Sequence, residues 1–134
     1  MKELELEATV ENLDEVLAFV DKQLEEFGCP MKTQMQVDIA VEEIFVNIAK
    51  YAYGAETGKV TISVSVSDRE ATIEFRDSGV PFNPLEKADP DVTLSAEERN
   101  IGGLGIYLVK KNTDGVTYQY QDNQNVLTLK KLLQ

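Results

Sequence analysis

The sequence predicts an α+β fold, a two-layer α/β sandwich in which helices cover one face of a mixed, mostly antiparallel β-sheet. Two pairs of segments alternate between apolar and polar residues, each pair around a short polar turn, as in antiparallel hairpins. Two further segments have apolar residues at helical spacing. With 134 residues, 43% of them hydrophobic, residues 1–134 suit a single domain with one core.

The first half of the chain is predicted to contain one strand and two helices. Residues 3–10 alternate as a half-buried strand does. A helix follows, with Asn12 as its expected N-cap and Glu15 completing a capping box, and it ends near Gly28. Thr33 is the expected N-cap of the second helix. The core stripe of that helix is formed by Val37, Val41, Ile44, Ile48 and Ala52.

The second half is predicted to contain two hairpins separated by a long irregular segment and a helix. The first hairpin turns near Asp68-Arg69 and the second around Asp122-Asn123. Residues 78–100 are rich in proline and acidic residues and have little periodicity; such a long loop is usually functional, often a lid. A third helix is expected just after residues 102–105. The predicted order is β-α-α-β-β-loop-α-β-β.

Composition excludes several classes of function. The net charge of −11 argues against direct binding of nucleic acid or of anionic membranes. The absence of histidine excludes Ser-His-Asp and Cys-His catalysis and HExxH zinc sites within this chain. We see no signal peptide and no apolar run of about 18 residues, so a cytoplasmic location is expected. Chemistry must then use carboxylates, amides, hydroxyls, lysine, arginine and metal ions.

Glu43 and Asn47 form the first candidate site. They lie four residues apart and therefore on one face of the second predicted helix, beside its core stripe. The carboxylate could orient an attacking hydroxyl or accept its proton. The amide oxygen is a hard ligand that suits Mg²⁺. The same pair is also common on ordinary solvated helix faces, so both interpretations stay open for the pair alone.

The second candidate site is the segment from Asp77 to Phe82, where an apolar strand ends in an acid and a glycine turn. The acid could accept a hydrogen bond from an exocyclic amino group such as that of adenine. Gly79 would allow a flat ring to approach the backbone closely. An ordinary Asp-x-Gly turn is the alternative.

The third candidate site has glycine at positions 102, 103 and 105, at the start of a predicted helix. Such a start exposes successive N–H groups and the positive end of the helix dipole, which favours phosphate binding. It is neither a Walker A loop nor a dinucleotide fingerprint. A flexible hinge into the helix is the alternative.

Taken together in this order, the three motifs resemble the N, G1 and G2 boxes of the GHKL ATPase superfamily, most closely those of the stand-alone anti-sigma factor serine/threonine kinases of bacteria. Residues 41–47 (VEEIFVN) resemble the N box, 76–84 (RDSGVPFNP) the G1 box and 101–109 (IGGLGIYLV) the G2 box. The ending 125–129 (NVLTL) is also similar, so the resemblance covers nearly the whole chain.

The resemblance implies the Bergerat ATP-binding fold and a site for ATP and Mg²⁺. Carried over by position, it makes Glu43 the general base and Asn47 the ligand of Mg²⁺. It implies that Asp77 binds the adenine amino group and that Gly79 lines the adenine pocket.

The resemblance also implies roles for the C-terminal half. Gly103, Leu104 and Gly105 would donate N–H groups to phosphates. Thr128 matches a late-strand threonine that approaches adenine, and residues 83–101 would form the ATP lid.

The implied function is that of a Mg-ATP-binding anti-sigma regulatory factor with serine/threonine kinase activity toward a small anti-anti-sigma (STAS-type) partner. A sigma factor is the other implied partner, and a homodimer is expected because family members dimerise through their sheet. Tyr51 stands where relatives often carry histidine, which leaves kinase competence open. An ATP-gated binding module without phosphotransfer, or a fragment of a larger ATPase such as a histidine kinase, is the alternative.

Overall fold

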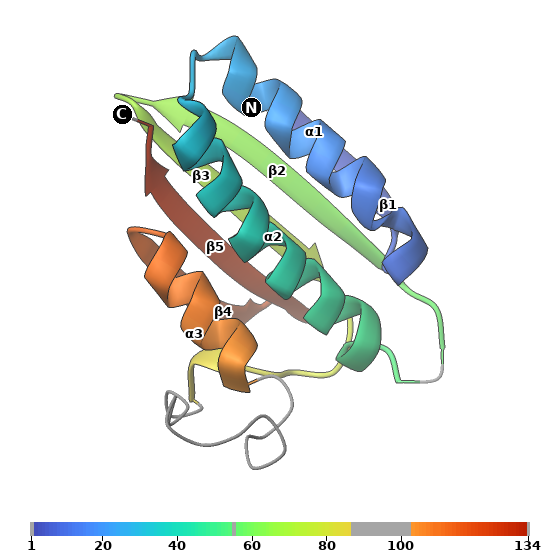
Figure 1. The fold of residues 1–134 in the computed structure, drawn as a ribbon. Coiled ribbons are helices and arrows are strands. Elements are labelled where there is room, and N and C mark those ends of the chain that lie inside the picture. Colours follow the sequence, from blue (N-terminus) through green and yellow to red (C-terminus); the bar gives the residue numbers. More distant parts are fainter. Residues whose placement is uncertain (1, 55, 87–102, 134) are drawn as a thin grey trace.

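A computed structural model of the chain describes residues 2–54, 56–86 and 103–133 (Figure 1). The order of elements agrees with the predicted one. The elements are β1 (Lys2–Glu7), the 3₁₀ turn η1 (Val10–Asn12), α1 (Leu13–Glu26), α2 (Met31–Tyr51), β2 (Lys59–Ser67), β3 (Glu70–Asp77), the 3₁₀ turn η2 (Pro84–Glu86), α3 (Gly103–Asn112), β4 (Gly115–Gln121) and β5 (Gln124–Leu132).

The strands form one sheet in the order β1-β2-β3-β5-β4. Helices α1, α2 and α3 lie side by side on one face of this sheet (Figure 1). The predicted α+β two-layer architecture is therefore confirmed. Every pairing between the described strands is antiparallel, so the parallel component that we allowed for is not seen among them. Among the described residues, no helix is long and apolar enough to span a membrane.

Both hairpin turns lie where the sequence places them. Asp68 and Arg69 have φ of 53° and 66°, and Asp122 and Asn123 have φ of 54° and 63°. Two successive positive φ values define a type I′ turn, whose twist matches that of the flanking strands. The turns fix the registers of β2 with β3 and of β4 with β5; the separate pairing of β3 with β5 joins the two hairpins and sets Asp77 opposite Asn125.

One of the two predicted helix caps is wrong. Asn12 is the N-cap residue of α1, as predicted, but it makes no side-chain capping bond; its Nδ2 instead donates to the carbonyl oxygen of Glu7 at 2.9 Å, and the 3₁₀ turn η1 precedes the helix. Thr33 does not cap α2, since the helix begins two residues earlier and Thr33 is buried inside its first turn. The end of α1 is as predicted, with Gly28 at φ +73°.

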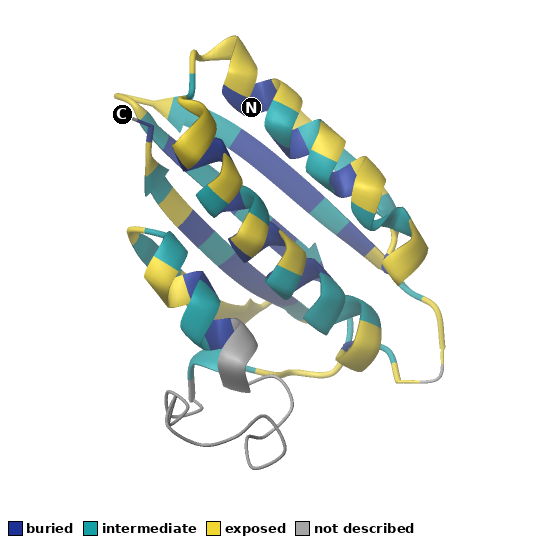
Figure 2. Cartoon of the chain, viewed as in Figure 1, coloured by how far each residue is buried: buried dark blue, intermediate teal, exposed yellow. Residues whose placement is uncertain are grey.

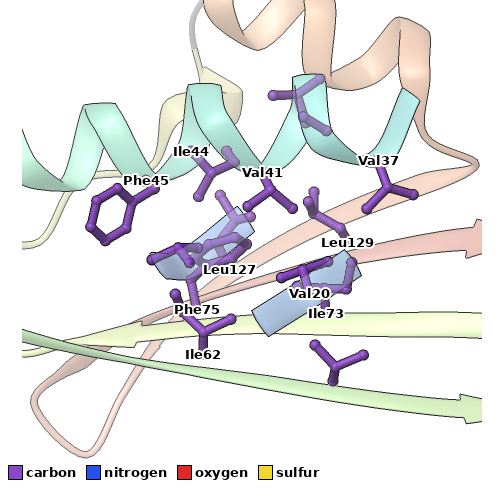
Figure 3. Packing of buried hydrophobic residues seen from close by; sticks show 14 of the residues in the cluster. Val20, Val37, Val41, Ile44, Phe45, Ile62, Ile73, Phe75, Leu127 and Leu129 are labelled. Atoms are coloured by element: carbon purple, nitrogen blue, oxygen red, sulfur yellow. The ribbon is translucent and has the colours of Figure 1, made fainter. Parts of the chain in front are cut away.

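The hydrophobic core lies between the helices and the sheet (Figure 3). Figure 2 shows that the buried positions of α1 and α2 face the sheet, whereas their outer sides are exposed. The largest fully buried side chains include Phe45 and Phe75, which come from α2 and β3. The predicted stripe of α2 contributes Val37, Val41 and Ile44 to this core.

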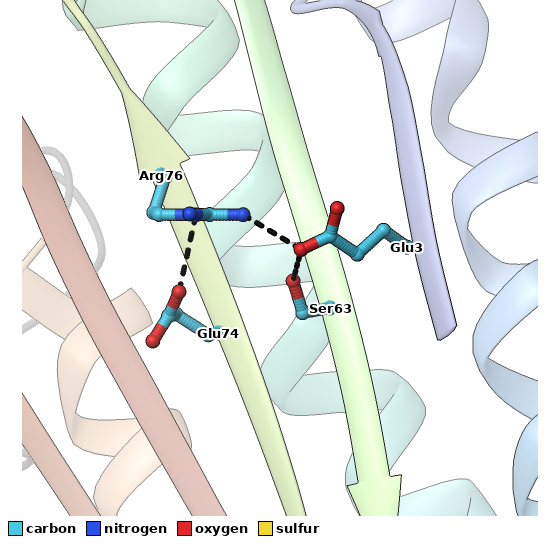
Figure 4. Close-up of polar contacts among 4 residues, drawn as sticks. All are labelled: Glu3, Ser63, Glu74 and Arg76. Carbon is cyan, nitrogen blue, oxygen red and sulfur yellow. Dashed lines mark hydrogen bonds and ion pairs between the residues drawn. The ribbon is translucent and has the colours of Figure 1, made fainter. Parts of the chain in front are cut away.

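The other face of the sheet is polar. Glu3, Ser63, Glu74 and Arg76 from three neighbouring strands form one cluster there (Figure 4). The Arg76 guanidinium lies 2.9 Å from the carboxylate of Glu3 and 3.1 Å from that of Glu74, and Ser63 donates to Glu3 at 3.1 Å. An antiparallel sheet with one packed and one solvated face has this pattern.

Two carboxyl groups meet where α1 and α2 pack together. Asp38 on α2 has its pKa raised to about 8, first by burial, then by the hydrogen bond and charge of Asp21 on α1, and finally by the charges of Glu25 and Glu42. Asp38 therefore keeps its proton at neutral pH in the folded protein and loses it on unfolding.

This proton makes stability depend on pH. Below the unfolded pKa of about 4 both states bind the proton; between about 4 and 8 only the folded state does, so the free energy of unfolding falls as pH rises through this window. Asp38→Asn should remove this slope. We therefore compare the free energy of unfolding of the variant with that of wild type at each pH. After allowance for solvent screening, this difference should be about 1–2 kcal/mol more favourable to the variant at pH 8 than at pH 5. Urea unfolding of both proteins at both pH values measures this difference. If wild type and Asp38→Asn lost the same stability between pH 5 and pH 8, Asp38 would not hold the proton that we assign to it.

Candidate functional site

A cleft with about 480 Å³ of empty space, partly open to solvent, lies between the C-terminal half of α2 and the adjoining ends of β3, β4 and β5. Its walls are mostly apolar and aromatic, with a few polar groups. Such a composition is typical of small-molecule sites. The lining residues are Ile44, Asn47, Ile48, Tyr51, Ala52, Phe75, Asp77, Val80, Phe82, Pro84, Tyr118, Asn125 and Leu127.

Asp77 is the buried acid of this cleft and the last residue of β3. Its Oδ1 accepts hydrogen bonds from the Gly79 N–H at 2.9 Å and from Asn125 Nδ2 at 3.0 Å. Its Oδ2 has no hydrogen-bond partner among the described residues. Burial raises the pKa of Asp77, and the two hydrogen bonds partly offset this shift. The site thus holds one oriented carboxyl oxygen ready for a ligand that donates a hydrogen bond.

Asn125 on β5 is a site residue that the sequence reasoning missed. Besides bonding Asp77, its Nδ2 donates to the carbonyl oxygen of Val80 at 2.9 Å, and its Oδ1 accepts from the N–H of Phe82 at 3.1 Å and from the hydroxyl of Tyr118. Asn125 therefore ties the segment after β3 to the sheet. The sequence does contain a sign of this role. Asn125, Leu127 and Leu129 alternate along the strand and so share its buried face, where a polar residue is unusual.

Thr128 does not lie in the cleft. Its partner across β3 is Glu74, which belongs to the polar outer cluster, whereas Phe75 and Asp77 pair with Leu127 and Asn125 on the helix side. Since side chains alternate along a strand, Thr128 faces away from the helices. The late-strand polar residue that lines the cleft is Asn125.

Gly79 lies where the chain passes against the end of α2. The N–H of Val80 donates to the carbonyl oxygen of Ala52 at 2.9 Å. A Cβ on Gly79 would lie 2.2 Å from that oxygen and 2.6 Å from its carbonyl carbon. The backbone contact leaves no space for a side chain, so glycine is required here by packing against α2.

Gly79→Ala should therefore destabilise the protein. The new methyl group meets backbone atoms that cannot rotate away, and overpacking of this kind costs about 3 kcal/mol. Thermal or urea unfolding measures the loss. Gly54→Ala is a matched control for crowding, because nothing lies within 4 Å of a Cβ there and only its positive φ is strained. A loss in Gly79→Ala no larger than the loss in Gly54→Ala would show that the contact with Ala52 does not produce the expected overpacking cost.

Glu43 and Asn47 lie one turn apart on α2, as predicted, but only Asn47 lines the cleft. The Asn47 side chain has no hydrogen-bond partner among the described residues. Glu43 is partly buried one turn earlier along the helix. Burial, followed by the charge of Glu42, raises its pKa, and Lys50 lowers it. The structure thus brings Asn47 and Asp77 to one cleft and leaves Glu43 outside its lining.

The third motif falls at the border of the described residues. Helix α3 begins at Gly103, so Gly103, Leu104 and Gly105 form its first turn rather than preceding it. Helix α3 packs against α2 on the helix side of the sheet (Figure 1). Gly102 and residues 87–101 of the predicted lid lie outside the described residues.

The fold and the cleft together define a class of protein. Helices on one face of an antiparallel sheet, with a buried acid at a strand end and an asparagine on the central helix, are the features of the histidine kinase-like ATPase fold that the three motifs resemble. The family of the histidine kinase-like ATPase domain matches residues 6–131. The chain belongs to this family.

Individual relatives share part of their length with this chain. A serine-protein kinase RsbW from Listeria monocytogenes serovar 1/2a is 31% identical over 97 residues, which cover 69% of this chain and 62% of the relative. An anti-sigma F factor from Clostridium acetobutylicum is 27% identical over 95 residues, covering 71% of this chain and 66% of the relative. The chain thus spans about two thirds of the length of these relatives.

One solved structure confirms the fold. The RsbU and RsbW domains of a Mycobacterium tuberculosis protein superpose with a TM-score of 0.69 at 14% identity, over 99% of this chain and 33% of that chain. At this identity the match concerns the fold only. It agrees with the α+β layers described above.

Proposed function

We propose that this protein is an ATP-binding anti-sigma regulatory factor that transfers phosphate to a serine of a small anti-anti-sigma partner. The observation that carries the ATP-binding part is Asp77, a buried acid whose Oδ1 accepts from two protein donors and whose Oδ2 has no partner in the part of the chain that the structure describes. The relatives named serine-protein kinase and anti-sigma factor support the remainder. The proposed partners are a sigma factor and an anti-anti-sigma protein of the STAS type.

The cleft fits the adenine ring of ATP. Adenine is flat and apolar on its faces and carries an exocyclic amino group that donates hydrogen bonds. Ile48, Phe75 and Leu127 supply apolar walls, and Asp77 supplies the acceptor. The Gly79 N–H, held against Ala52 by close packing, donates to Oδ1 of Asp77 and so fixes the orientation of the acceptor.

Asn47 is the residue that would hold Mg²⁺. Its amide lines the cleft and has no partner within residues 2–54, 56–86 and 103–133, and an amide oxygen is a ligand that Mg²⁺ accepts. Among the described residues, no group of three acids or cysteines could hold a metal ion by itself. A site in which Asn47 works together with phosphate oxygens and water therefore suits Mg²⁺, which usually keeps several such ligands. The ion would neutralise phosphate charge in a protein with net charge −11.

Glu43 is the proposed general base. Its carboxylate would take the proton of the attacking serine hydroxyl, whose oxygen bonds to the γ-phosphorus while the bond to ADP breaks. Its raised pKa makes it a better proton acceptor than an ordinary glutamate. The position of Glu43 outside the cleft lining favours a second candidate, an ATP-gated binding module without phosphotransfer.

Calorimetric titration with ATP tests the binding function. We expect micromolar binding in the presence of Mg²⁺ that weakens in excess EDTA. Asn47→Ala should weaken binding about tenfold in Mg²⁺ and remove the difference between Mg²⁺ and EDTA, because the amide ligand is lost. Asn112→Ala, on α3, is the matched control. Absence of ATP binding by a folded wild-type protein would overturn the proposal.

A further inference from the structure

The outer side of the first half of α2 is apolar although it faces solvent. Met31, Met35 and Ile39 follow one another at intervals of four residues and are 68%, 59% and 43% exposed. Phe27, just before this helix, is 58% exposed. We call these four residues the apolar row. Figure 2 shows exposed positions along this outward side of α2, opposite the core stripe. Helix α2 thus has a second apolar side, which a solvated surface helix lacks.

An acidic row runs beside the apolar row, where α1 and α2 meet. It consists of Asp21 and Glu25 on α1 and of Asp38 and Glu42 on α2. The charges of the other three act on Asp38, which holds its proton at neutral pH, so the negative charge of the row lies on Asp21, Glu25 and Glu42. No lysine or arginine among the described residues forms an ion pair with any of these four acids. The Oδ1 atoms of Asp21 and Asp38 are buried without a hydrogen-bond partner. The Glu25 carboxylate accepts a hydrogen bond from the neutral amide of Gln34, at 3.2 Å. This surface therefore lacks a cover for its apolar side chains and, among the described residues, a cation to balance its carboxylates.

The charge of this surface selects the kind of partner. A second copy of the chain would bring another net charge of −11 to the acidic row, and an anionic lipid surface would be repelled as well. A segment with lysine or arginine would instead provide the missing positive charge. Because the apolar row repeats every four residues, it can pack as a ridge into the groove of another helix, and flexible methionines adapt to such a contact.

We propose that the apolar row and the acidic row together form a docking surface for an amphipathic helix of a partner protein, whose apolar stripe is flanked by lysine or arginine. The apolar side chains would pack on Met31, Met35 and Ile39, and the basic side chains would reach the acids between α1 and α2. Helix-in-groove recognition of this kind reads apolar anchors at helical spacing.

This inference goes beyond the proposed function and can fail separately from it. None of the eight residues lines the cleft. An ATP titration therefore tests the cleft, whereas a peptide titration tests the docking surface.

The experiment uses two synthetic helical peptides that share one leucine stripe, one with lysine flanks and one with glutamate flanks. Fluorescence anisotropy of each labelled peptide is measured with the wild-type protein and with two double variants. We expect the lysine peptide to bind at least tenfold more tightly than the glutamate peptide. Met35→Ser with Ile39→Ser, and separately Glu25→Gln with Glu42→Gln, should each weaken the lysine peptide at least tenfold. The second pair should also reduce the salt dependence of binding.

Matched controls separate this surface from a general attraction to an acidic protein. Glu5→Gln with Glu7→Gln removes two exposed charges from β1, and Leu132→Ser removes an exposed apolar side chain from β5. Both controls should bind the lysine peptide within about twofold of wild type. Circular dichroism checks that every variant is folded.

Two outcomes would overturn the proposal. The first is equal weakening by the control pair on β1, which would mean nonspecific charge attraction. The second is wild-type protein that sediments as a dimer and becomes monomeric in Met35→Ser with Ile39→Ser, which would make a second copy the occupant.

Discussion

Replacing Asp77 with asparagine is expected to weaken ATP binding about 30-fold or more, which corresponds to about 2 kcal/mol. Gly79 N–H and Asn125 Nδ2 both donate to Oδ1, so the amide of the variant must keep its oxygen at that position. Its NH₂ group then replaces Oδ2 and faces the adenine amino group, donor against donor. Calorimetry with Mg-ATP measures the loss.

The control for this change is Asp122→Asn in the β4–β5 turn, where the acid is exposed and asparagine tolerates the positive φ of 54°. It should bind ATP like wild type. The adenine assignment of Asp77 would be wrong if the folded Asp77→Asn protein bound ATP with unchanged affinity.

Glu43→Gln is expected to slow phosphotransfer to a partner serine by about 10²- to 10⁴-fold, the range for loss of a general base. ATP affinity should stay within about threefold of wild type, because Glu43 does not line the cleft. The pH dependence gives a second signature. Burial raises the pKa of Glu43, so transfer should decline as pH falls through that raised pKa, and the glutamine variant should lack this decline. Transfer of labelled phosphate from ATP measures both effects.

Glu15→Gln, at an exposed position of α1, is the control and should transfer phosphate at the wild-type rate. Undiminished transfer by Glu43→Gln would remove Glu43 from the mechanism. A wild-type protein that binds its partner in an ATP-dependent manner but transfers nothing would favour the ATP-gated module.

Most elements could be predicted from the sequence because their signals are local. Alternation indicated the strands on both sides of Asp68-Arg69 and of Asp122-Asn123, and the spacing of Val37, Val41 and Ile44 indicated the core side of α2. The prediction of Thr33 as a cap was wrong, and Asn12 stands at its predicted N-cap position without a capping hydrogen bond. A capping pattern is short, so an earlier helix start or an adjacent 3₁₀ turn overrides it.

The resemblance to three sequence boxes led to Asn47 and Asp77, which the structure brings to one cleft. It also led to Thr128, where alternation with Leu127 and Leu129 already indicated the opposite face. Asn125 was overlooked because its role depends on partners far along the chain. Its contacts to Asp77 and Val80 span 48 and 45 residues.

The sequence by itself determined the family, the order of elements, the turns and the side of α2 that enters the core, because each depends on residues a few positions apart or on one ordered set of motifs. Only the tertiary structure decided which polar side chains meet. Pairing of β3 with β5 sets Asp77 opposite Asn125, and a slip of one residue would turn Asn125 away from the cleft. Packing of α1 on α2 likewise places four acids beside an exposed apolar row, a juxtaposition that no local pattern contains.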